Sequence, residues 1–500
     1  MEEYFRVVTL KARWFSQKGS FVFMFLVILL LGIFLRFHEL GEESIWVDEA
    51  FTYHYVNLDF SELIETLRGD VHPVLFYALG HWWVQAFGNS EFSLRFLPFL
   101  FGSLSIIVMF FLVRELYGRK RAVLSMLFFS LSYTMILYSQ EAKMYMQFMF
   151  FFLLGLWFLI RFVKNPSGGN LVVLTTAHVL LLHTHFLSFV VILLEVALYL
   201  ILYYIFSKRN IDLLQERFGF ASHFSLRRFG YFLGVVALSY VLWIPIFINQ
   251  VQYLLTFVLK EKFELKFGFD GFYALLAAAV VFNLVIIPLW WREIISHERS
   301  FQNVRTFLSC IKIPSWMFAV FFLIFLWFNW KNAEYYFGNV TYIRYLIFLV
   351  PLLHIFLGLQ MMKLERRWFV VLLLVYIVVT SSIMINYYSV DAKEQWREAA
   401  GYVQENVGND VLLFHTSGHT WWAFNYYFDG NVTQVRLKYG EPLNPLYEGL
   451  RGKEYAYLIL SHNFRQPTFF NDLLDKQYKV VEKKEFIGIT IYKYSVGQKK

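Results

Sequence analysis

The sequence predicts a polytopic α-helical membrane protein that ends in a small α/β domain. Of its 500 residues, 58% are hydrophobic and only 16% are charged, whereas a soluble globular chain is about half apolar and about a quarter charged. The mean hydropathy is +0.49. The apolar residues form long runs that stop near residue 388. We therefore expect a membrane domain over 1–387 and a soluble domain over 388–500.

About eleven apolar runs are long enough to cross a bilayer, which takes about 20 residues for a helix. They lie near 20–37, 92–113, 122–139, 144–162, 171–185, 186–206, 229–249, 271–291, 315–330, 342–362 and 368–386. No small-residue cleavage site follows the first run, so we interpret it as a retained span and not as a signal peptide.

The loops between these runs carry charge unevenly. With a cytosolic N-terminus, most loop Lys and Arg residues fall on the cytosolic side, as the positive-inside rule requires. We therefore expect a multi-pass protein of the cell (cytoplasmic) membrane whose C-terminal domain is extracytoplasmic. These loops also account for the net charge of +8, so we reject a nucleic-acid partner.

The first outer loop, over 38–91, is long and contains three segments of helical character. They cover 49–56, 61–68 and 73–87. Ser61, followed by acidic residues within one turn, resembles a capped helix start. Short amphipathic or apolar helices beside a membrane usually lie along its surface, so we expect interfacial helices here.

The C-terminal part has the pattern of a soluble α/β domain. The segment 393–407 places Trp396, Ala399, Ala400 and Val403 on one helical face. Strands are expected over 411–414, 455–460, 478–485 and 487–494, with a helix over 418–428 and a turn near Gly488.

Asp48 and Glu49 are adjacent carboxylates about ten residues after the first apolar run. Sugar transfer to a hydroxyl or amine needs a base that accepts the proton of the acceptor, and a carboxylate at the membrane surface can supply it. The alternative is a pair of solvated loop charges. The apolar neighbours Trp46, Phe51 and Tyr53 favour a site.

A second polar group lies where the 122–139 and 144–162 runs meet. Tyr138, Glu141 and Tyr145 would share a face if the helix continued through this junction. Lys143 is a cation that could neutralise a lipid phosphate. The alternative for Lys143 is an ordinary snorkelling lysine paired with Glu141.

Arg344 and Tyr345 open the tenth run, where Arg offers a planar fork and Tyr a hydroxyl donor for a phosphate. The alternative is an interfacial anchor. His72, His183 and His185 could ligate a metal or donate hydrogen bonds. His183 and His185 are two residues apart, which is a poor spacing in a helix for binding one metal ion together. Cys310 is the one cysteine, so neither a disulfide within the chain nor a Cys-based metal site is expected.

Several of these stretches resemble, in order and spacing, the GT-C membrane glycosyltransferases, within them the dolichyl-phosphate-mannose–protein mannosyltransferases and aminoarabinose transferases. The resemblance is carried by Arg36-Phe37, Trp46-Val47-Asp48-Glu49-Ala50, Asp70-Val71-His72-Pro73-Val74-Leu75-Phe76-Tyr77, Glu91-Phe92-Ser93-Leu94-Arg95, Tyr138-Ser139-Gln140-Glu141-Ala142-Lys143-Met144-Tyr145 and Arg344-Tyr345-Leu346 with Pro351. It covers roughly 20–200 well and is thinner over 210–335.

The resemblance implies an inverting transferase that uses a polyprenyl-phosphate-linked sugar on the outer face of the membrane. Asp48 matches the catalytic aspartate of the family and Glu49 its partner. The remaining matches are expected to bind the donor phosphate or substrate: His72, Tyr138, Glu141, Lys143, Arg344 and Tyr345. Family members often have Arg at the position of Lys143 and a second Pro at the position of Val74.

We therefore predict a glycosyltransferase whose acceptor is a protein, a lipid or a glycan. Neither the sugar nor the acceptor follows from the sequence, and a divalent metal ion is left open. The main alternative is a transporter or flippase for a lipid-linked or small solute. Transporters favour midplane charges and paired repeats, and no repeat is visible here. An oligosaccharide or phosphoglycan transferase of the same superfamily is a second enzyme alternative.

Overall fold

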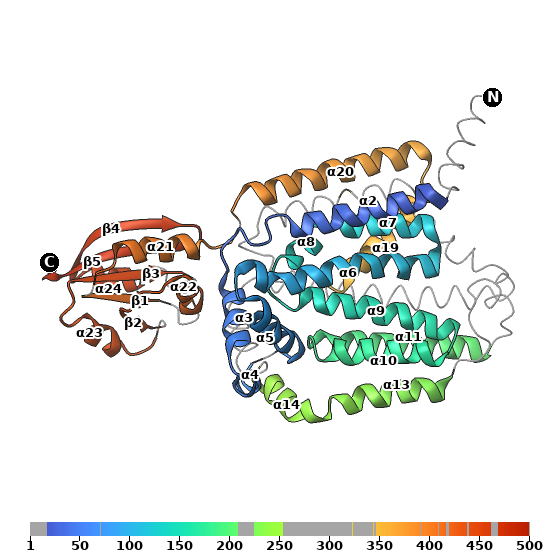
Figure 1. Cartoon of the computed structure of the whole chain (residues 1–500), viewed down its shortest axis with the longest axis horizontal. Coiled ribbons are helices and arrows are strands. Elements are labelled where there is room, and N and C mark those ends of the chain that lie inside the picture. Colours follow the sequence, from blue (N-terminus) through green and yellow to red (C-terminus); the bar gives the residue numbers. More distant parts are fainter. Residues whose placement is uncertain are drawn as a thin grey trace.

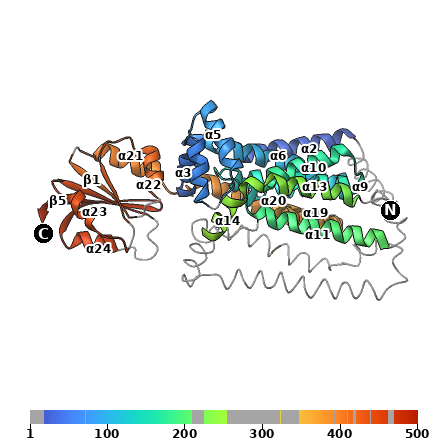
Figure 2. The same cartoon turned by 90° about the horizontal axis from the view of Figure 1, so that it is seen from below.

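A computed structural model gives the fold of this chain. It describes residues 18–70, 72–208, 225–253, 323, 344, 347–391, 393–408, 410–416, 420–437, 440–461 and 469–499. Long helices lie side by side in one bundle, short helices cover one end of it, and a mixed α/β domain follows at that end (Figures 1 and 2).

The bundle contains helices that overlap the predicted apolar runs. They are α2 (Lys18–Phe37), α6 (Glu91–Tyr117), α7 (Arg119–Ser130), α8 (Tyr133–Ser139), α9 (Tyr145–Lys164), α10 (Gly168–Leu182), α11 (Leu187–Lys208), α13 (Leu226–Ser239), α14 (Ile244–Tyr253), α19 (Leu349–Met361) and α20 (Arg366–Ser389). A short 3-10 turn, η1 (Val241–Trp243), joins α13 to α14.

By length and apolar composition, five helices of the described residues could each cross a membrane, or six if the bent pair α7–α8 forms one span. Helices α10, α11 and α19 are apolar but shorter. The predicted runs over 271–291 and 315–330 lie outside the described residues, apart from 323. The total of eleven therefore stays a prediction.

The sequence pattern predicts one continuous span over 122–139, and this prediction is wrong. The run is broken between α7 and α8, whose axes meet at 60°. The buried Arg36 of α2 donates to the carbonyl oxygens of Ser130 (3.0 Å) and Phe129 (3.2 Å). Breaking a helix frees backbone carbonyls that must find donors when buried, and Arg36 satisfies them from a neighbouring helix.

Three short helices cover one end of the bundle, in the predicted first outer loop. They are α3 (Val47–Asn57), α4 (Phe60–Arg68) and α5 (Leu75–Phe87). Helix α4 begins one residue before the predicted Ser61. Helix α5 begins two residues after Pro73, which precedes the helix and does not open it. The three helices pack through Val56, Leu63 and Tyr77, all fully or almost fully buried.

The C-terminal domain is a five-stranded sheet with the order β2-β1-β3-β5-β4. Its strands are β1 (Val411–His415), β2 (Thr433–Arg436), β3 (Tyr455–Leu460), β4 (Tyr478–Phe486) and β5 (Ile489–Lys499). β1 pairs in parallel with β2 and β3, and β5 pairs antiparallel with β3 and β4. Gly488, with φ of 75°, makes the tight turn between β4 and β5 that the sequence predicts.

Helices cover both faces of this sheet (Figures 1 and 2). α21 (Trp396–Asn406) and α22 (Trp421–Tyr427) pack against the face that carries Leu413 and Ile459. α23 (Asn444–Leu450) and α24 (Phe469–Asp475) pack against the opposite face, which carries Leu412 and Leu458. Successive strand residues thus alternate between two cores, as the pleat of a strand requires. The sequence pattern did not predict β2, α23 or α24.

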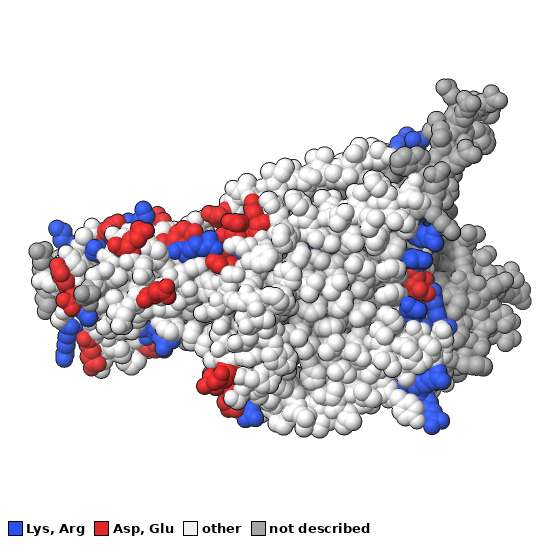
Figure 3. Space-filling model, viewed as in Figure 1, with Lys and Arg blue, Asp and Glu red and all other residues white. Residues whose placement is uncertain are grey.

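The predicted buried face of α21 is confirmed, because Trp396, Ala399, Ala400 and Val403 are all 0% exposed. Surface charge also follows a simple pattern. Figure 3 shows Lys and Arg gathered at the bundle end farthest from the C-terminal domain, with an almost uncharged belt between. An apolar belt bounded by basic residues on one side is typical of a membrane domain with that side in the cytosol.

Candidate active site

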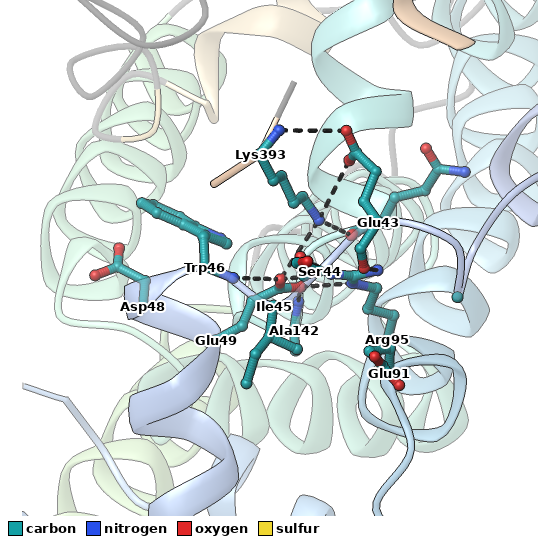
Figure 4. A network of polar contacts seen from close by, with 12 residues as sticks. Glu43, Ser44, Ile45, Trp46, Asp48, Glu49, Glu91, Arg95, Ala142 and Lys393 are labelled. Carbon is teal, nitrogen blue, oxygen red and sulfur yellow. Dashed lines mark hydrogen bonds and ion pairs between the residues drawn. The ribbon is translucent and has the colours of Figure 1, made fainter. Parts of the chain in front are cut away.

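The first turn of α3 carries both Asp48 and Glu49. Consecutive helical residues point about 100° apart, so the two carboxylates enter different surroundings. Figure 4 shows the Asp48 carboxylate directed away from the group of side chains around Glu49. Acidic residues in the first turn are stabilised by the positive end of the helix dipole.

Glu49 is held in a fully buried network. Arg95 of α6 donates to it from Nε (2.8 Å) and Nη2 (2.7 Å). The backbone N–H of Ala142 donates at 2.9 Å, and Lys393 Nζ lies 3.4 Å away. Burial opposes ionisation, but the charges of Arg95 and Lys393 and these hydrogen bonds lower the pKa of Glu49 to about 2. Glu49 is therefore ionised and has no access to solvent or substrate.

Asp48 has more exposure and a different partner. Its side chain is 32% exposed, and its Oδ2 accepts a hydrogen bond from Arg344 Nη1 at 2.9 Å. Burial opposes ionisation, but the charges of Lys143, Arg344 and His72 together lower the pKa of Asp48 below its ordinary value. Two cations from distant parts of the chain therefore act on one accessible carboxylate.

Lys143 lies in the turn between α8 and α9 and is only 4% exposed. Its ammonium makes no direct hydrogen bond or ion pair within the described residues, although its charge acts on Asp48. The alternative pairing with Glu141 does not occur there. A cation at such a position can neutralise the charge of an anionic ligand.

Tyr138 and Glu141 are both buried at this junction. The helix does not continue through it, because α8 ends at Ser139 and α9 begins at Tyr145. The expected common face of Tyr138, Glu141 and Tyr145 is therefore not formed. The rings of Tyr138 and Tyr145 still meet, with centroids 5.0 Å apart.

His72 lies at the start of the segment that leads into α5. Its Nδ1 is 3.1 Å from Asp70 Oδ1, and its backbone carbonyl accepts from Gln250 Nε2 at 3.0 Å. His183 faces the carbonyl oxygen of Ser239, whereas His185 packs against aromatic rings including Tyr145. Among the described residues no three His, Cys, Asp or Glu side chains could hold a metal ion. Tyr345 lies outside those residues.

Two residues of this network, Arg95 and Lys393, are not among the site residues predicted from the sequence. Arg95 belongs to a stretch that carries the family resemblance, so a signal for it existed. Lys393 opens the predicted helical segment 393–407, but it is 344 positions from Glu49, and no local pattern links the two residues. Conversely, the residues expected to bind a phosphate, Lys143 and Arg344, do lie around the same carboxylate.

Comparisons with known proteins agree with the fold. The model of the dolichyl-phosphate-mannose–protein mannosyltransferase family matches residues 71–224. The crystal structure of ArnT from Cupriavidus metallidurans bound to undecaprenyl phosphate has a TM-score of 0.54 at 11% identity, over 95% of this chain and 98% of that chain. Its apo structure gives 0.54 at 12% identity, over 96% and 98%.

An oligosaccharyltransferase from Archaeoglobus fulgidus is less similar, with a TM-score of 0.48 at 11% identity over 94% of this chain and 72% of that chain. No curated protein matches the sequence significantly. With the two ArnT structures this chain shares a polytopic membrane fold of the GT-C type. The family model covers 71–224, which is less than half of the chain, and the structural matches at 11–12% identity are evidence for a shared fold.

Proposed function

We propose that this protein is an inverting glycosyltransferase that moves a sugar from a polyprenyl-phosphate-linked donor to an acceptor on the extracytoplasmic side of the membrane. The observation that carries this proposal is the meeting of Asp48, Arg344 and Lys143. Arg344 bonds directly to Asp48 at 2.9 Å, and the charge of Lys143 acts on the same carboxylate.

The lipid phosphate of the donor takes its place between Lys143 and Arg344. ArnT, which shares the fold, has been crystallised with undecaprenyl phosphate, and this supports a donor of that chemical class. When the phosphate arrives, Arg344 turns part of its guanidinium from Asp48 to the phosphate oxygens, since its fork can serve two anions. Asp48 then faces the acceptor with less positive charge beside it.

In the transfer step, the acceptor oxygen or nitrogen attacks the anomeric carbon from the face opposite the phosphate. Its proton passes to the Asp48 carboxylate as the new bond forms. The bond between the anomeric carbon and the phosphate oxygen breaks, and its electron pair leaves with the lipid phosphate. Lys143 and Arg344 stabilise the negative charge that develops there, a type of contribution worth several kcal/mol.

Glu49 takes a supporting part in this proposal and not the catalytic part expected from the sequence. It is 0% exposed and fully engaged by Arg95, Ala142 and Lys393. His72, Tyr138 and Glu141 line the same end of the bundle, and we assign them to the donor side of the site. The fixed position of Glu49 sets the direction in which the neighbouring Asp48 points.

The test is Asp48→Asn, which keeps the shape of the side chain and removes the base. Purified protein in liposomes is given a panel of polyprenyl-phosphate sugars, and release of polyprenyl phosphate is measured. Wild type is expected to turn over at least one donor, and Asp48→Asn to be slower by about 10²-fold or more. Near-normal transfer by a folded Asp48→Asn protein contradicts the assignment. Solute uptake without transfer by wild type favours the transporter alternative.

A further inference from the structure

We propose that Lys393, which the C-terminal domain carries into the membrane domain, is a positioning residue of the transferase site. It holds helix α3 and the segment 140–143 at a fixed separation. The C-terminal domain is then part of the catalytic unit and not an appended module. This inference deepens the proposed function, because it concerns the distance between Asp48 and Lys143.

Lys393 lies between the end of α20 and the start of α21, and its side chain is only 2% exposed. Its Nζ donates to the backbone carbonyl of Gln140 at 3.1 Å and lies 3.4 Å from Glu49 Oε2. Figure 4 shows the side chain reaching down to the buried carboxylate from the C-terminal side. One ammonium therefore touches both segments that carry site residues.

These two segments are the ones whose spacing decides the chemistry. Glu49 is adjacent to Asp48 in α3, and Gln140 is three residues before Lys143. Glu49 also accepts a hydrogen bond from the Ala142 backbone N–H at 2.9 Å. The segment 140–143 is therefore held at two positions, by Lys393 at Gln140 and by Glu49 at Ala142. A shift at this junction would move the phosphate-binding cation relative to the base.

Lys393 shares its surroundings with two carboxylates, Glu43 and Glu49, and with the second cation Arg95. Its Nζ lies 4.0 Å from Glu43 Oε2, and Arg95 and Lys393 both face Glu49. Without Lys393, Glu49 keeps its hydrogen bonds from Arg95 and Ala142, so the carboxylate stays paired. Removal of the lysine is therefore expected to loosen the geometry without leaving an isolated buried charge.

The rest of the domain boundary holds the domain in place and offers a control. Arg397 donates to Glu91 at 2.6 Å, and Tyr427 OH accepts from the Ile45 N–H at 2.8 Å. His54 of α3 stacks on Trp422 with ring centroids 3.7 Å apart. Arg397 joins the same two parts of the chain as Lys393 but touches neither Glu49 nor the segment 140–143.

The experiment compares Lys393→Met, Lys393→Arg and the matched interface control Arg397→Gln with wild type. Each full-length protein is purified in detergent, its unfolding temperature is recorded, and its affinity for undecaprenyl phosphate is measured from protection against unfolding. The transfer rate is then determined per folded molecule. Lys393→Met is expected to bind about ten-fold more weakly and to have a kcat lower by about 10²-fold, the size of effect that a misplacement of about 1 Å produces.

Lys393→Arg keeps the charge and is expected to fall between Lys393→Met and wild type. Arg397→Gln should lower the unfolding temperature while keeping affinity and kcat per folded molecule. A Lys393→Met affinity within about two-fold of wild type overturns the inference, as does an equal loss in Arg397→Gln. If Lys393→Met does not fold, Lys393→Gln takes its place, because it also removes the ammonium, and wild-type affinity and kcat there exclude a positioning role. If wild type binds the lipid phosphate but transfers no sugar, the proposed function fails and the binding comparison still judges Lys393.

Discussion

Two neighbouring carboxylates at the start of α3 differ in what surrounds them. Glu49 is sealed and paired, whereas Asp48 keeps 32% of its side-chain surface exposed and contacts a cation that a phosphate could share. Residue type and position are almost the same, so the different surroundings are the basis of the different roles that we propose for Asp48 and Glu49.

The environment of Asp48 predicts the acid side of the pH profile. Its pKa lies below the ordinary value of 3.8, since Lys143 and Arg344 outweigh the effect of burial. The base form therefore persists as pH falls, and kcat/KM is expected to decline only below about pH 4, as far as the fold survives. Initial rates across a pH series measure this, and an acid limb near pH 6 or above, in protein that is still folded, would contradict it.

The environment of Glu49 predicts how the stability of the fold changes with pH. Its pKa is about 2 in the folded protein against 4.5 as a reference. A group with a lowered folded pKa stabilises the fold fully above the unfolded pKa and loses this contribution as pH falls through the folded value. The free energy of unfolding should therefore keep the full contribution of Glu49 above about pH 4.5 and lose it progressively between about pH 4.5 and pH 2.

Lys143 provides a second test at the level of one side chain. Lys143→Met removes the charge and should lower kcat/KM by about 10²-fold, because one stabilising contact to the leaving phosphate is lost. Lys143→Arg keeps the charge and should retain most activity. Rates at varied donor concentration distinguish them, and equal losses in both variants would argue against a charge contact with the donor.

At the scale of elements, close helix contacts fix the junction that carries Lys143. Helix α6 meets α8 at Gly102, where an added Cβ would lie 3.0 Å from Ser139 Cβ and overlap its hydroxyl. Ser139 is the last residue of α8 before the segment 140–143. This contact therefore determines where the segment begins.

Gly102→Ala is expected to destabilise the protein by about 1–3 kcal/mol through overpacking, with a loss of donor affinity. The control is Gly234→Ala in α13, where an added Cβ meets nothing within 4 Å. Ala has the higher helix propensity, so the control should be neutral or slightly stabilising. Thermal unfolding in detergent measures both, and equal behaviour of the two variants would contradict the close α6–α8 contact.

The elements also show what sequence patterns can predict. Runs of apolar residues locate α2, α6, α9 and α20 well, because crossing a bilayer requires a helix of that length. The break between α7 and α8 was not predictable, since its carbonyls are satisfied by Arg36 from another helix. In the C-terminal domain, β2, α23 and α24 are too short to show a clear hydrophobic period in the sequence.

The sequence also predicts some residues of the candidate site but not the contacts between them. Asp48, Lys143 and Arg344 were found because each is a polar group at the end of an apolar run. Their partners could not be predicted from neighbouring sequence, because the partners are far apart along the chain. Arg344 is 296 positions from Asp48, and Lys393 is 344 positions from Glu49. Only the folded chain shows which carboxylate each cation meets.

At the scale of the whole molecule, the apolar belt of Figure 3 separates a basic end from the end that carries the site. We therefore propose that the C-terminal domain lies outside the cell. With Cys310 replaced by Ser, a cysteine at the exposed Lys484 should react with a membrane-impermeant maleimide on intact cells. A cysteine at Arg119, at the basic end, should react only after permeabilisation. The reverse pattern would contradict this orientation.

The central claim is that Asp48 is the base of a sugar transfer at the outer membrane surface. The most direct measurement is mass spectrometry of cell-surface glycans from cells that contain equal amounts of wild-type or Asp48→Asn protein, beside cells that lack it. We expect one sugar-modified species to be present with wild type and absent from both other samples. Its persistence at wild-type level with Asp48→Asn would contradict the account.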